Sequence, residues 1–290
     1  MPGPLVSVPD LQAELAGPRP PVLLDVRWSL GGPPGAAEHA RGHLPGAVYV
    51  DLDTQLSRPR GPGEGRHPLP EAGALQRTLR AAGVSAGSRV VAYDAGPGTS
   101  AARAWWVLRW AGLADVAVLD GGLAAWRAAG AAVSTEAPRP VPGDVEVHPG
   151  ALPVLDAAAA AALARSGVLL DARSPERYRG ESEPVDPVAG HVPGALNAPT
   201  TGVLGADGRF LPPQRLREHF ARLGVGTGDA GTGEAGTGPA VGAYCGSGIT
   251  AAHLLLALEV AGVPAVLYPG SWSEWVADPA RPVATGAGPG

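Results

Sequence analysis

Residues Gly42–Ala47 read GHLPGA, and residues Gly190–Ala195 read GHVPGA. A second block repeats in the same order, because LLDVR at Leu23–Arg27 returns as LLDAR at Leu169–Arg173. The offset between the copies is about 150 residues, which is too long for the stacked units of a solenoid, so we predict two homologous domains. The polar residues of these blocks also occur in the half that lacks a cysteine, and they are therefore expected to be structural: Asp25, Arg27, His43, Asp171, Arg173 and His191.

Short apolar runs alternate with helical patterns in both halves. We expect strands at residues 22–26, 47–50, 90–93, 116–119, 168–171, 240–244 and 265–268, and helices at 71–82, 100–111, 213–223 and 250–261. This alternation favours an α/β fold, in which each domain has a mostly parallel sheet with helices on both faces. Ligands of such sheets bind beyond the carboxyl ends of the strands.

Changes in composition indicate the domain boundaries. We expect a first domain at residues 1–137, a proline-rich linker at 138–149 and a second domain at 150–290. Residues 224–239 are rich in Gly, Thr and Ala and predict a flexible surface loop. The residues after Ala280 are expected to form a frayed tail.

Composition also limits the class of protein and its partners. Of the 290 residues, 45% are hydrophobic and 17% are charged, which is typical of a globular protein. The net charge of −5 argues against nucleic acid as the main partner. We find no signal peptide and no run of about 18 uninterrupted apolar residues, so no membrane partner is expected. The single cysteine cannot form an internal disulfide, which favours a reducing, cytoplasmic location.

That cysteine lies in the segment most informative about function. Residues Val241–Thr250 read VGAYCGSGIT, which predicts a strand, a glycine-bearing loop that starts at Cys245, and then a helix. Backbone N–H groups and a helix N-terminus converge in such a loop, which favours the thiolate form of a cysteine and can bind an anion. The first half carries Asp94 at the same place in the repeat, within YDAG at Tyr93–Gly96.

Together these motifs resemble the two-domain rhodanese-like sulfurtransferases over nearly the whole chain. In that family the carboxyl-terminal domain carries the nucleophile and the amino-terminal domain is typically inactive. Asp94 fits this pattern, because an aspartate cannot carry a sulfane sulfur. The loop Cys245–Thr250 (CGSGIT) is similar to the CG[S/T]GVT loop of the mercaptopyruvate type, whereas thiosulfate-type enzymes tend to carry basic residues after the cysteine.

The resemblance implies a role for each residue of the site. The loop residues would bind the substrate around the nucleophile Cys245: Gly246, Gly248, Ile249 and Thr250. Ser247 would act with a histidine and an aspartate of the first half, whose counterparts are His67 and Asp53. A simpler interpretation of Ser247 is that it only caps the following helix.

Recognition of the substrate carboxylate departs from the family pattern. The resemblance assigns this role to Arg177, but a second arginine that the family commonly carries in Pro-Glu-Pro-Arg is missing from Glu183–Pro187 (EPVDP). Arg179 is a candidate substitute. A surface ion pair with Glu176 or Glu181 is the simpler interpretation of Arg177.

The implied reaction is a sulfur transfer in two steps. Cys245 takes a sulfur atom from 3-mercaptopyruvate as a persulfide, and a small thiol, a thioredoxin-like protein or cyanide then accepts it. No metal and no cofactor are expected. Thiosulfate as the donor and a non-enzymatic persulfide carrier remain as alternatives. A phosphatase is disfavoured, because Ala251 stands where an arginine would close the phosphate-binding loop.

Overall fold

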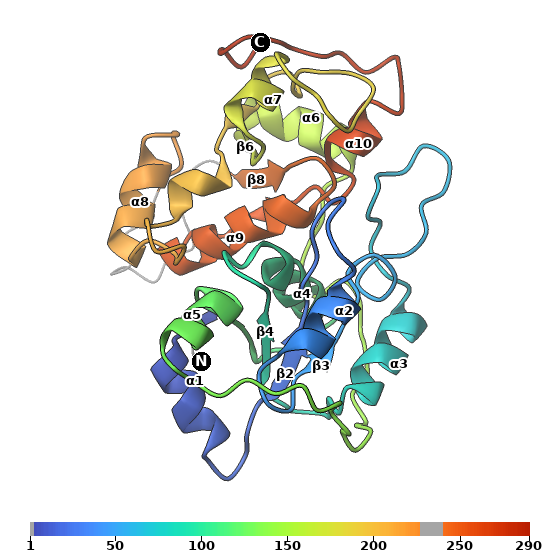
Figure 1. Cartoon of the computed structure of the whole chain (residues 1–290). Helices are drawn as coiled ribbons and strands as arrows, with labels where there is room; N and C mark the ends of the chain where they lie inside the picture. Colours follow the sequence, from blue (N-terminus) through green and yellow to red (C-terminus); the bar gives the residue numbers. More distant parts are fainter. Residues whose placement is uncertain (1–2, 227–239) are drawn as a thin grey trace. The chain divides into compact units, whose positions relative to one another are not determined.

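A computed structural model describes residues 3–226 and 240–290 of the chain (Figure 1). Most of the segment expected to form a surface loop, residues 227–239, lies outside the described residues. The chain divides into two compact units, of which the first comprises Met1–Arg58, Leu69–Leu152 and Ala206–Arg209, and the second Pro59–Pro68, Pro153–Gly205 and Phe210–Gly290. A short segment of the first half, Pro59–Pro68, therefore belongs to the second unit. The boundaries of the expected linker at 138–149 stay a prediction.

The first unit is built on one parallel sheet with the strand order β1-β5-β4-β2-β3. Its strands are β1 (Leu5–Val6), β2 (Val22–Asp25), β3 (Val48–Tyr49), β4 (Val90–Tyr93) and β5 (Val116–Leu119). Its helices are α1 (Val8–Leu15), α2 (Gly35–Arg41), α3 (Ala72–Ala81), α4 (Thr99–Trp110) and α5 (Gly122–Ala128).

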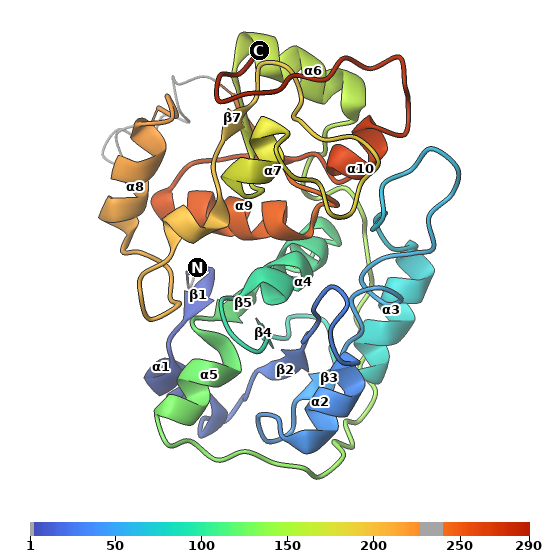
Figure 2. The ribbon, with the colours of Figure 1, turned by 45° about the horizontal axis from the view of Figure 1, so that its top comes forward.

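Helices cover both faces of this sheet, because successive side chains of a buried strand point in opposite directions. Leu23 of β2 and Val91 of β4 belong to a buried cluster with Leu11 of α1 and Trp126 of α5. The long helix α4 packs against β4 and β5 with a different set of buried residues. Figure 2 shows α1 and α5 on one side of the sheet and α4 on the other.

The second unit repeats this arrangement, since its parallel order β7-β6-β8-β9 matches β3-β2-β4-β5 of the first. Its strands are β6 (Val168–Asp171), β7 (Leu196–Asn197), β8 (Val241–Tyr244) and β9 (Val266–Leu267). Its helices are α6 (Ala157–Ser166), α7 (Pro175–Arg179), the 3-10 turn η1 (Thr200–Val203), α8 (Pro213–Ala221), α9 (Ile249–Ala261) and α10 (Ser271–Trp275).

The predicted fold class is confirmed: each unit has a parallel sheet with helices. The predicted strands correspond to β2, β3, β4, β5, β6, β8 and β9, and the predicted helices to α3, α4, α8 and α9. Among the described residues, no helix combines the length and the apolar character that crossing a membrane requires.

A buried ion pair recurs at the ends of the central strands and supports the structural role expected of Asp25, Arg27, Asp171 and Arg173. Asp25 at the end of β2 binds Arg27 with an Nη2–Oδ2 distance of 2.6 Å and also accepts a hydrogen bond from the hydroxyl of Tyr93 at 2.7 Å. Asp171 and Arg173 repeat the pair after β6, again at 2.6 Å. The pairing offsets the cost of burying these charges. It fixes the strand ends from which the functional loops start.

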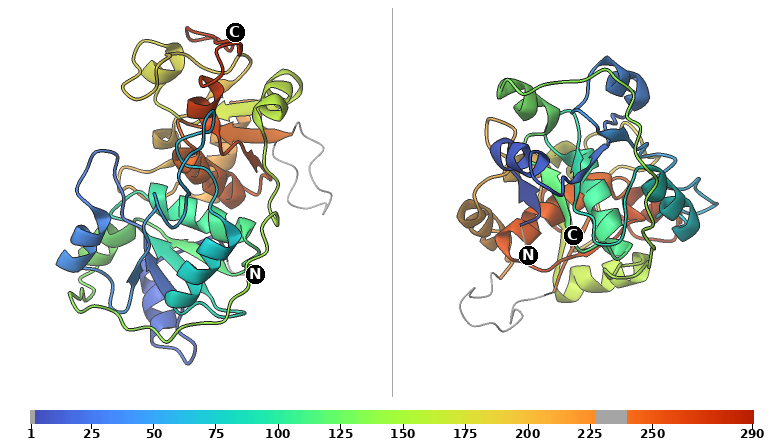
Figure 3. Two further views of the ribbon diagram at one scale, coloured as in Figure 1. Left: turned by 90° about the vertical axis from the view of Figure 1, so that its right-hand side faces the viewer. Right: turned by 90° about the horizontal axis from the view of Figure 1, so that it is seen from below.

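The residues after α10 do not form the frayed tail expected from the sequence. Ala284 exchanges two backbone hydrogen bonds with His191, of 2.8 and 3.0 Å, and the N–H of Gly194 donates to the carbonyl of Pro289 at 2.6 Å. Figures 2 and 3 show this segment in dark red, returning across the second unit. The prediction was wrong because backbone groups, which leave no pattern in the sequence, hold the segment in place.

Candidate active site

Cys245 lies between β8 and α9, at the carboxyl end of the parallel sheet of the second unit. The residue is 2% exposed, and the backbone N–H of Gly248 points at its Sγ with an N–S distance of 3.1 Å. Gly248 has a φ of 82°, a left-handed conformation that turns the chain back toward the sulfur before α9 begins with Ile249 and Thr250. The N–H group and the N-terminus of α9 both direct positive partial charge toward the sulfur.

The first turn of α10 holds the backbone of this loop. The Oγ of Ser271 accepts a hydrogen bond from the N–H of Cys245 at 3.1 Å. The N–H groups of Trp272 and Ser273 donate to the carbonyls of Cys245 and Gly246 at 2.9 and 3.0 Å. Ser271 itself has a φ of 54°, which is strained for a residue other than glycine and persists only because its surroundings fix it. These hydrogen bonds hold the backbone of the cysteine loop against the start of α10.

Two guanidinium groups lie over Gly246, the residue after the cysteine. A Cβ atom at Gly246 would lie 2.9 Å from Nη2 of Arg66, and 3.5 and 3.6 Å from Nη2 and Nη1 of Arg177. Arg177 belongs to α7, and Arg66 to the segment Pro59–Pro68 of the same unit. Because Gly246 has no side chain, both cations come close to the backbone of the cysteine loop.

Two buried carboxylates hold these arginines. Glu183 accepts hydrogen bonds from Nε and Nη2 of Arg177 at 3.1 and 2.6 Å, and from Nη1 of Arg173 at 3.3 Å. Asp186 accepts from Nη1 of Arg66 and lies 3.4 Å from Nη2 of Arg177. The side chains of Glu183 and Asp186 are 3% and 4% exposed, whereas those of Arg66 and Arg177 are each 21% exposed. The cations are thus the part of the cluster that solvent reaches.

The two carboxylates differ in their affinity for a proton. Burial alone would raise the pKa of Glu183, but hydrogen bonds from Arg177 and from the N–H groups of Asp186 and Val185 outweigh it, so the pKa is lowered. Burial raises the pKa of Asp186; Arg66 opposes this rise, and the charge of Glu183 adds to it. Glu183 is therefore the firmer anion of the pair.

Close backbone contacts dock the segment Pro59–Pro68 on the start of α10. A Cβ atom at Gly65 would lie 2.4 Å from the carbonyl oxygen of Gly270, so a larger residue would not fit without a shift of the backbone. The N–H of Arg66 donates to the Oγ of Ser273 at 3.1 Å. The same helix start thus positions both the cysteine loop and the segment that carries Arg66.

The predicted residues Ser247 and His67 are both buried in the second unit, at 7% and 9% exposure. Ser247 does not cap α9, since the N-cap residue is Gly248 and no side chain caps the helix there. Asp53 belongs to the first unit, where its Oδ2 accepts a hydrogen bond from Nε1 of Trp28 at 2.9 Å. Joint action of the three residues stays a prediction.

The arginines of α7 have different surroundings. Arg179 pairs with Glu181 through Nε and Nη2, both at 2.7 Å, on the exposed side of the helix. Arg177 pairs with the buried Glu183, so the surface ion pair with Glu176 or Glu181 is the wrong interpretation of this residue. Of the two, only Arg177 approaches the cysteine loop at Gly246.

In the first unit a carboxylate occupies the corresponding place. Asp94 follows β4 as the cysteine follows β8, and it is 5% exposed. Its Oδ1 accepts hydrogen bonds from the N–H groups of Gly96 and Gly98, each at 3.0 Å, and its Oδ2 from those of Ser100 and Ala101 at 2.9 and 3.3 Å. Burial raises the pKa of Asp94, and these N–H groups oppose the rise. In this unit the carboxyl group of Asp94 thus occupies the space toward which the backbone N–H groups of the loop point.

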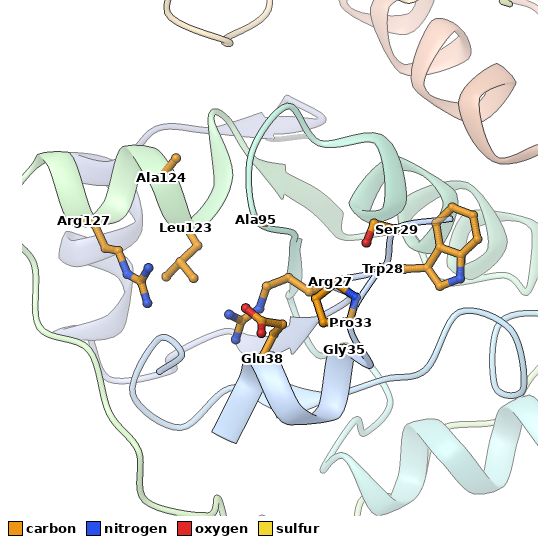
Figure 4. A pocket seen from close by; sticks show the side chains of 10 residues that line it. All are labelled: Arg27, Trp28, Ser29, Pro33, Gly35, Glu38, Ala95, Leu123, Ala124 and Arg127. Carbon is orange, nitrogen blue, oxygen red and sulfur yellow. The ribbon is translucent and has the colours of Figure 1, made fainter. Parts of the chain in front are cut away.

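A cavity of about 280 Å³ opens beside this loop of the first unit (Figure 4). Its lining includes Arg27, Ala95, Leu123 and Arg127. The N–H of Leu123 donates to the carbonyl of Asp94 at 2.9 Å, as the N–H of the first tryptophan of α10 does to the cysteine carbonyl. The cavity therefore corresponds to the cysteine site of the other unit, but no thiol faces it.

Arg66 and Asp186 were missed from the sequence. Asp186 lies in the stretch Glu183–Pro187, which lacks the arginine common in the family, and Arg66 directly precedes the predicted His67. The position of Arg66 was the only available signal.

The site as built can form an activated sulfur nucleophile beside a binding place for an oxoanion. The amide and the helix N-terminus direct positive partial charge toward the sulfur, and the two guanidinium groups suit a carboxylate or a sulfonate. In the part of the chain that the structure describes, no three His, Cys, Asp or Glu side chains are grouped so that they could hold a metal ion.

Comparison with known proteins agrees with the duplicated fold. Residues 7–129 and 156–278 each match the family described as the rhodanese-like domain. A Pseudomonas aeruginosa protein, named as a probable 3-mercaptopyruvate sulfurtransferase, is 49% identical over 97% of this chain and 98% of its own length. SseB of Mycobacterium tuberculosis, which is named as a putative thiosulfate sulfurtransferase, is 46% identical, with 97% of each chain covered. The crystal structure of SseA from Escherichia coli, a 3-mercaptopyruvate sulfurtransferase, aligns with a TM-score of 0.79 at 30% identity over 94% of this chain and 100% of that chain.

Proposed function

This chain belongs to the two-domain rhodanese-like sulfurtransferases, and we propose that it takes a sulfur atom from 3-mercaptopyruvate and passes it, through a persulfide on Cys245, to a thiol or to cyanide. One observation carries the proposal. The Sγ of Cys245 receives the N–H of Gly248 at the N-terminus of α9, and two guanidinium groups approach the next residue in the loop.

In the first step, the thiolate of Cys245 attacks the sulfur of 3-mercaptopyruvate. A sulfur–sulfur bond forms, and the bond between that sulfur and the methylene carbon breaks. The electron pair of the broken bond goes to the carbon, which gives the enolate of pyruvate, and a proton then completes pyruvate. In the second step, an acceptor thiolate or cyanide attacks the outer sulfur and restores the thiolate of Cys245.

We propose that Ser247 assists the first step. A hydroxyl that donates to the keto oxygen of the donor would stabilise the charge that develops as the enolate forms. His67 is proposed to orient this hydroxyl, and Asp53 to fix the tautomer of the histidine. The burial of Ser247 and His67 in the unit that carries Cys245 supports their part in this proposal.

Thiosulfate is the second candidate donor, because a pair of arginines also suits a dianion and one relative carries that activity in its name. We favour 3-mercaptopyruvate for two reasons: Ser247 is uncharged, and no basic residue follows Cys245 within the loop. A single buried cysteine in the chain supports a reducing compartment such as the cytoplasm, and a small thiol or a thioredoxin-like protein as the acceptor.

Mass spectrometry and steady-state kinetics test the proposal together. The intact protein should gain one sulfur atom after treatment with 3-mercaptopyruvate, and Cys245→Ser should gain none. Pyruvate should be released over many turnovers when an acceptor thiol is present, which excludes a carrier that is loaded only once. A higher kcat/KM for thiosulfate than for 3-mercaptopyruvate would overturn the choice of donor, and turnover by Cys245→Ser would overturn the mechanism.

A further inference from the structure

We propose that Arg66 supplies the second guanidinium of the donor-binding site and that Asp186 positions it there. The proposal deepens the function proposed above and rests on it, because the group to be bound is the oxoanion of the sulfur donor. That oxoanion is the carboxylate of 3-mercaptopyruvate or, for the alternative donor, the charged oxygens of thiosulfate. The observation behind it is the approach of Arg66 and Arg177 to a single residue, Gly246.

The two ends of the Arg66 guanidinium face different groups. Its Nη1 donates to the buried carboxylate of Asp186. Its Nη2 lies 2.9 Å from the position that a Cβ atom would take at Gly246, and it has no hydrogen-bond partner within residues 3–226 and 240–290. One nitrogen is thus used to fix the side chain, while the other keeps its donors for a ligand at the cysteine loop.

Arg177 is divided in the same way. Its Nε and Nη2 bind Glu183, whereas Nη1 lies 3.6 Å from the same Cβ position at Gly246. No partner for this Nη1 occurs in the described part of the chain. Each arginine therefore directs one donor nitrogen toward Gly246, the residue that follows Cys245. A planar oxoanion that accepts a hydrogen bond from each would be held beside the thiolate.

The carboxylates of this cluster are more deeply buried than the guanidinium groups, which suits the binding of an anion from solvent. The carboxylates of Glu183 and Asp186 are almost fully enclosed, whereas the side chains of Arg66 and Arg177 keep about a fifth of their surface exposed. An incoming anion therefore meets the guanidinium groups first. The enclosed carboxylates reduce the repulsion between the two cations when no ligand is bound.

The backbone of Arg66 is fixed as well as its side chain. The close approach of Gly65 to Gly270 and the hydrogen bond from the N–H of Arg66 to Ser273 attach this residue to the helix start that also holds the cysteine loop. Arg66 is therefore presented to the ligand with much of its conformational freedom already lost, which reduces the entropic cost of binding.

Arg66→Gln is the main test, with Arg60→Gln as the matched control, because Arg60 is an exposed arginine of the same segment. We expect Arg66→Gln to raise the KM for 3-mercaptopyruvate roughly ten- to hundredfold, as expected for a lost hydrogen bond to a charged group. kcat should change much less, because the contact is made in the ground state as well as in the transition state. Arg66→Lys should lie between wild type and Arg66→Gln, since it keeps the charge but not the forked donors.

A readout that does not depend on turnover separates the binding role from a structural one. Calorimetric titration with pyruvate should show weaker binding to Arg66→Gln than to Arg60→Gln. The uncharged pyruvamide, tested as a weak competitive inhibitor of 3-mercaptopyruvate, should inhibit both variants equally. The urea midpoint of each variant reports whether it is folded.

The positioning role of Asp186 is tested by a double-mutant cycle. Asp186→Asn should raise KM in the presence of Arg66, and it should add little in the Arg66→Gln background. Full additivity of the two effects would overturn the positioning role.

The results distinguish this proposal from the one on which it rests. If the wild type transfers sulfur from neither donor, the proposed function fails, and the titrations with pyruvate and thiosulfate still decide whether Arg66 binds an oxoanion. If the wild type is active and Arg66→Gln matches Arg60→Gln in KM and in anion binding, the role of Arg66 is overturned while the proposed function stands.

Discussion

Asp94 and Cys245 are equivalent residues of the two units, and each receives the N–H of the glycine that precedes the following helix. Gly98 donates to Oδ1 of Asp94 at 3.0 Å, and Gly248 donates to Sγ of Cys245 at 3.1 Å. The same backbone turn therefore donates hydrogen bonds to a carboxyl group in one copy and to a sulfur atom in the other. The first copy shows that this turn accommodates a buried acidic side chain.

Asp94→Asn should destabilise the first unit by about 2–4 kcal/mol, because an amide supplies only one acceptor oxygen where the carboxylate supplies two. The N–H groups of Ser100 and Ala101, or those of the glycines, would then face an NH2 group. Urea unfolding monitored by tryptophan fluorescence measures the loss. The exposed Asp207→Asn serves as a control that should change stability by less than about 0.5 kcal/mol.

The same variant also tests whether the first unit takes part in the chemistry. Because Asp94 is not a sulfur nucleophile, the folded fraction of Asp94→Asn should release pyruvate at the wild-type rate. A large loss of kcat in fully folded protein would contradict a structural role for Asp94.

The sequence predicted the longer strands well, but the two-residue strands β1 and β7 and several helices were missed. Buried strands such as β4 and β8 are continuous apolar runs that recur at matching places in the two copies, so the repeat identified them. Of the helices that were not predicted, α2, α5, α7 and α10 have five to seven residues each, which is too short for a helical period to appear, whereas α1 and α6 are longer and were missed as well. Their positions depend on tertiary packing and on loop geometry.

The candidate site was predicted where its residues are contiguous and missed where they are distant. The loop from Cys245 to Thr250 is one continuous motif. Arg66 reaches this loop because the segment Pro59–Pro68 belongs to the second unit, where Gly65 lies close to Gly270 and the N–H of Arg66 donates to Ser273. The residues Glu183–Pro187 give no sign of Arg66, because tertiary structure brings this arginine from the other half of the chain.

Ser247→Ala should slow the release of pyruvate from 3-mercaptopyruvate by roughly a hundredfold, as expected for the loss of a hydrogen bond to a developing oxyanion. Transfer from thiosulfate, which has no keto group, should change much less. Steady-state kinetics with both donors on the same preparation measure the difference. An equal loss with both donors would instead indicate that Ser247 supports the conformation of the loop.

Deletion of residues 284–290 should lower the stability of the second unit by about 2–4 kcal/mol, because the backbone bonds to His191 and Gly194 and the bond between the N–H of Gly286 and the carbonyl of Arg179 would be lost. Thermal unfolding followed by circular dichroism measures the effect. Removal of Gly290 alone retains the bond from Gly194 to Pro289 and is the control. Equal melting temperatures for the two truncations would show that the segment does not stabilise the unit.

The pH dependence of stability should differ between Glu183→Gln and the wild type in a defined direction. The pKa of Glu183 in the folded state is lowered from 4.5, since its hydrogen bonds with Arg177 and two backbone N–H groups outweigh the effect of burial. Between the folded and the unfolded pKa of Glu183, the unfolded state therefore binds more protons than the folded state. The carboxylate contributes stability above the unfolded pKa, and this contribution is lost as the pH falls through the folded pKa. The deficit of Glu183→Gln should be largest near pH 6 and should shrink below pH 4.5.

Asp186→Asn provides the opposite case, because burial raises the pKa of Asp186 above 3.8. The folded state then binds the proton more readily than the unfolded state, so this contribution is present below the unfolded pKa and is lost as the pH rises through the folded pKa. Relative to the wild type, Asp186→Asn should therefore gain stability as the pH rises through that window, while Glu183→Gln loses it. Urea unfolding of the three proteins at a series of pH values between roughly 3.5 and 7 measures both trends. Parallel curves for the two variants would show that Glu183 and Asp186 do not hold their protons with the different affinities that their environments imply.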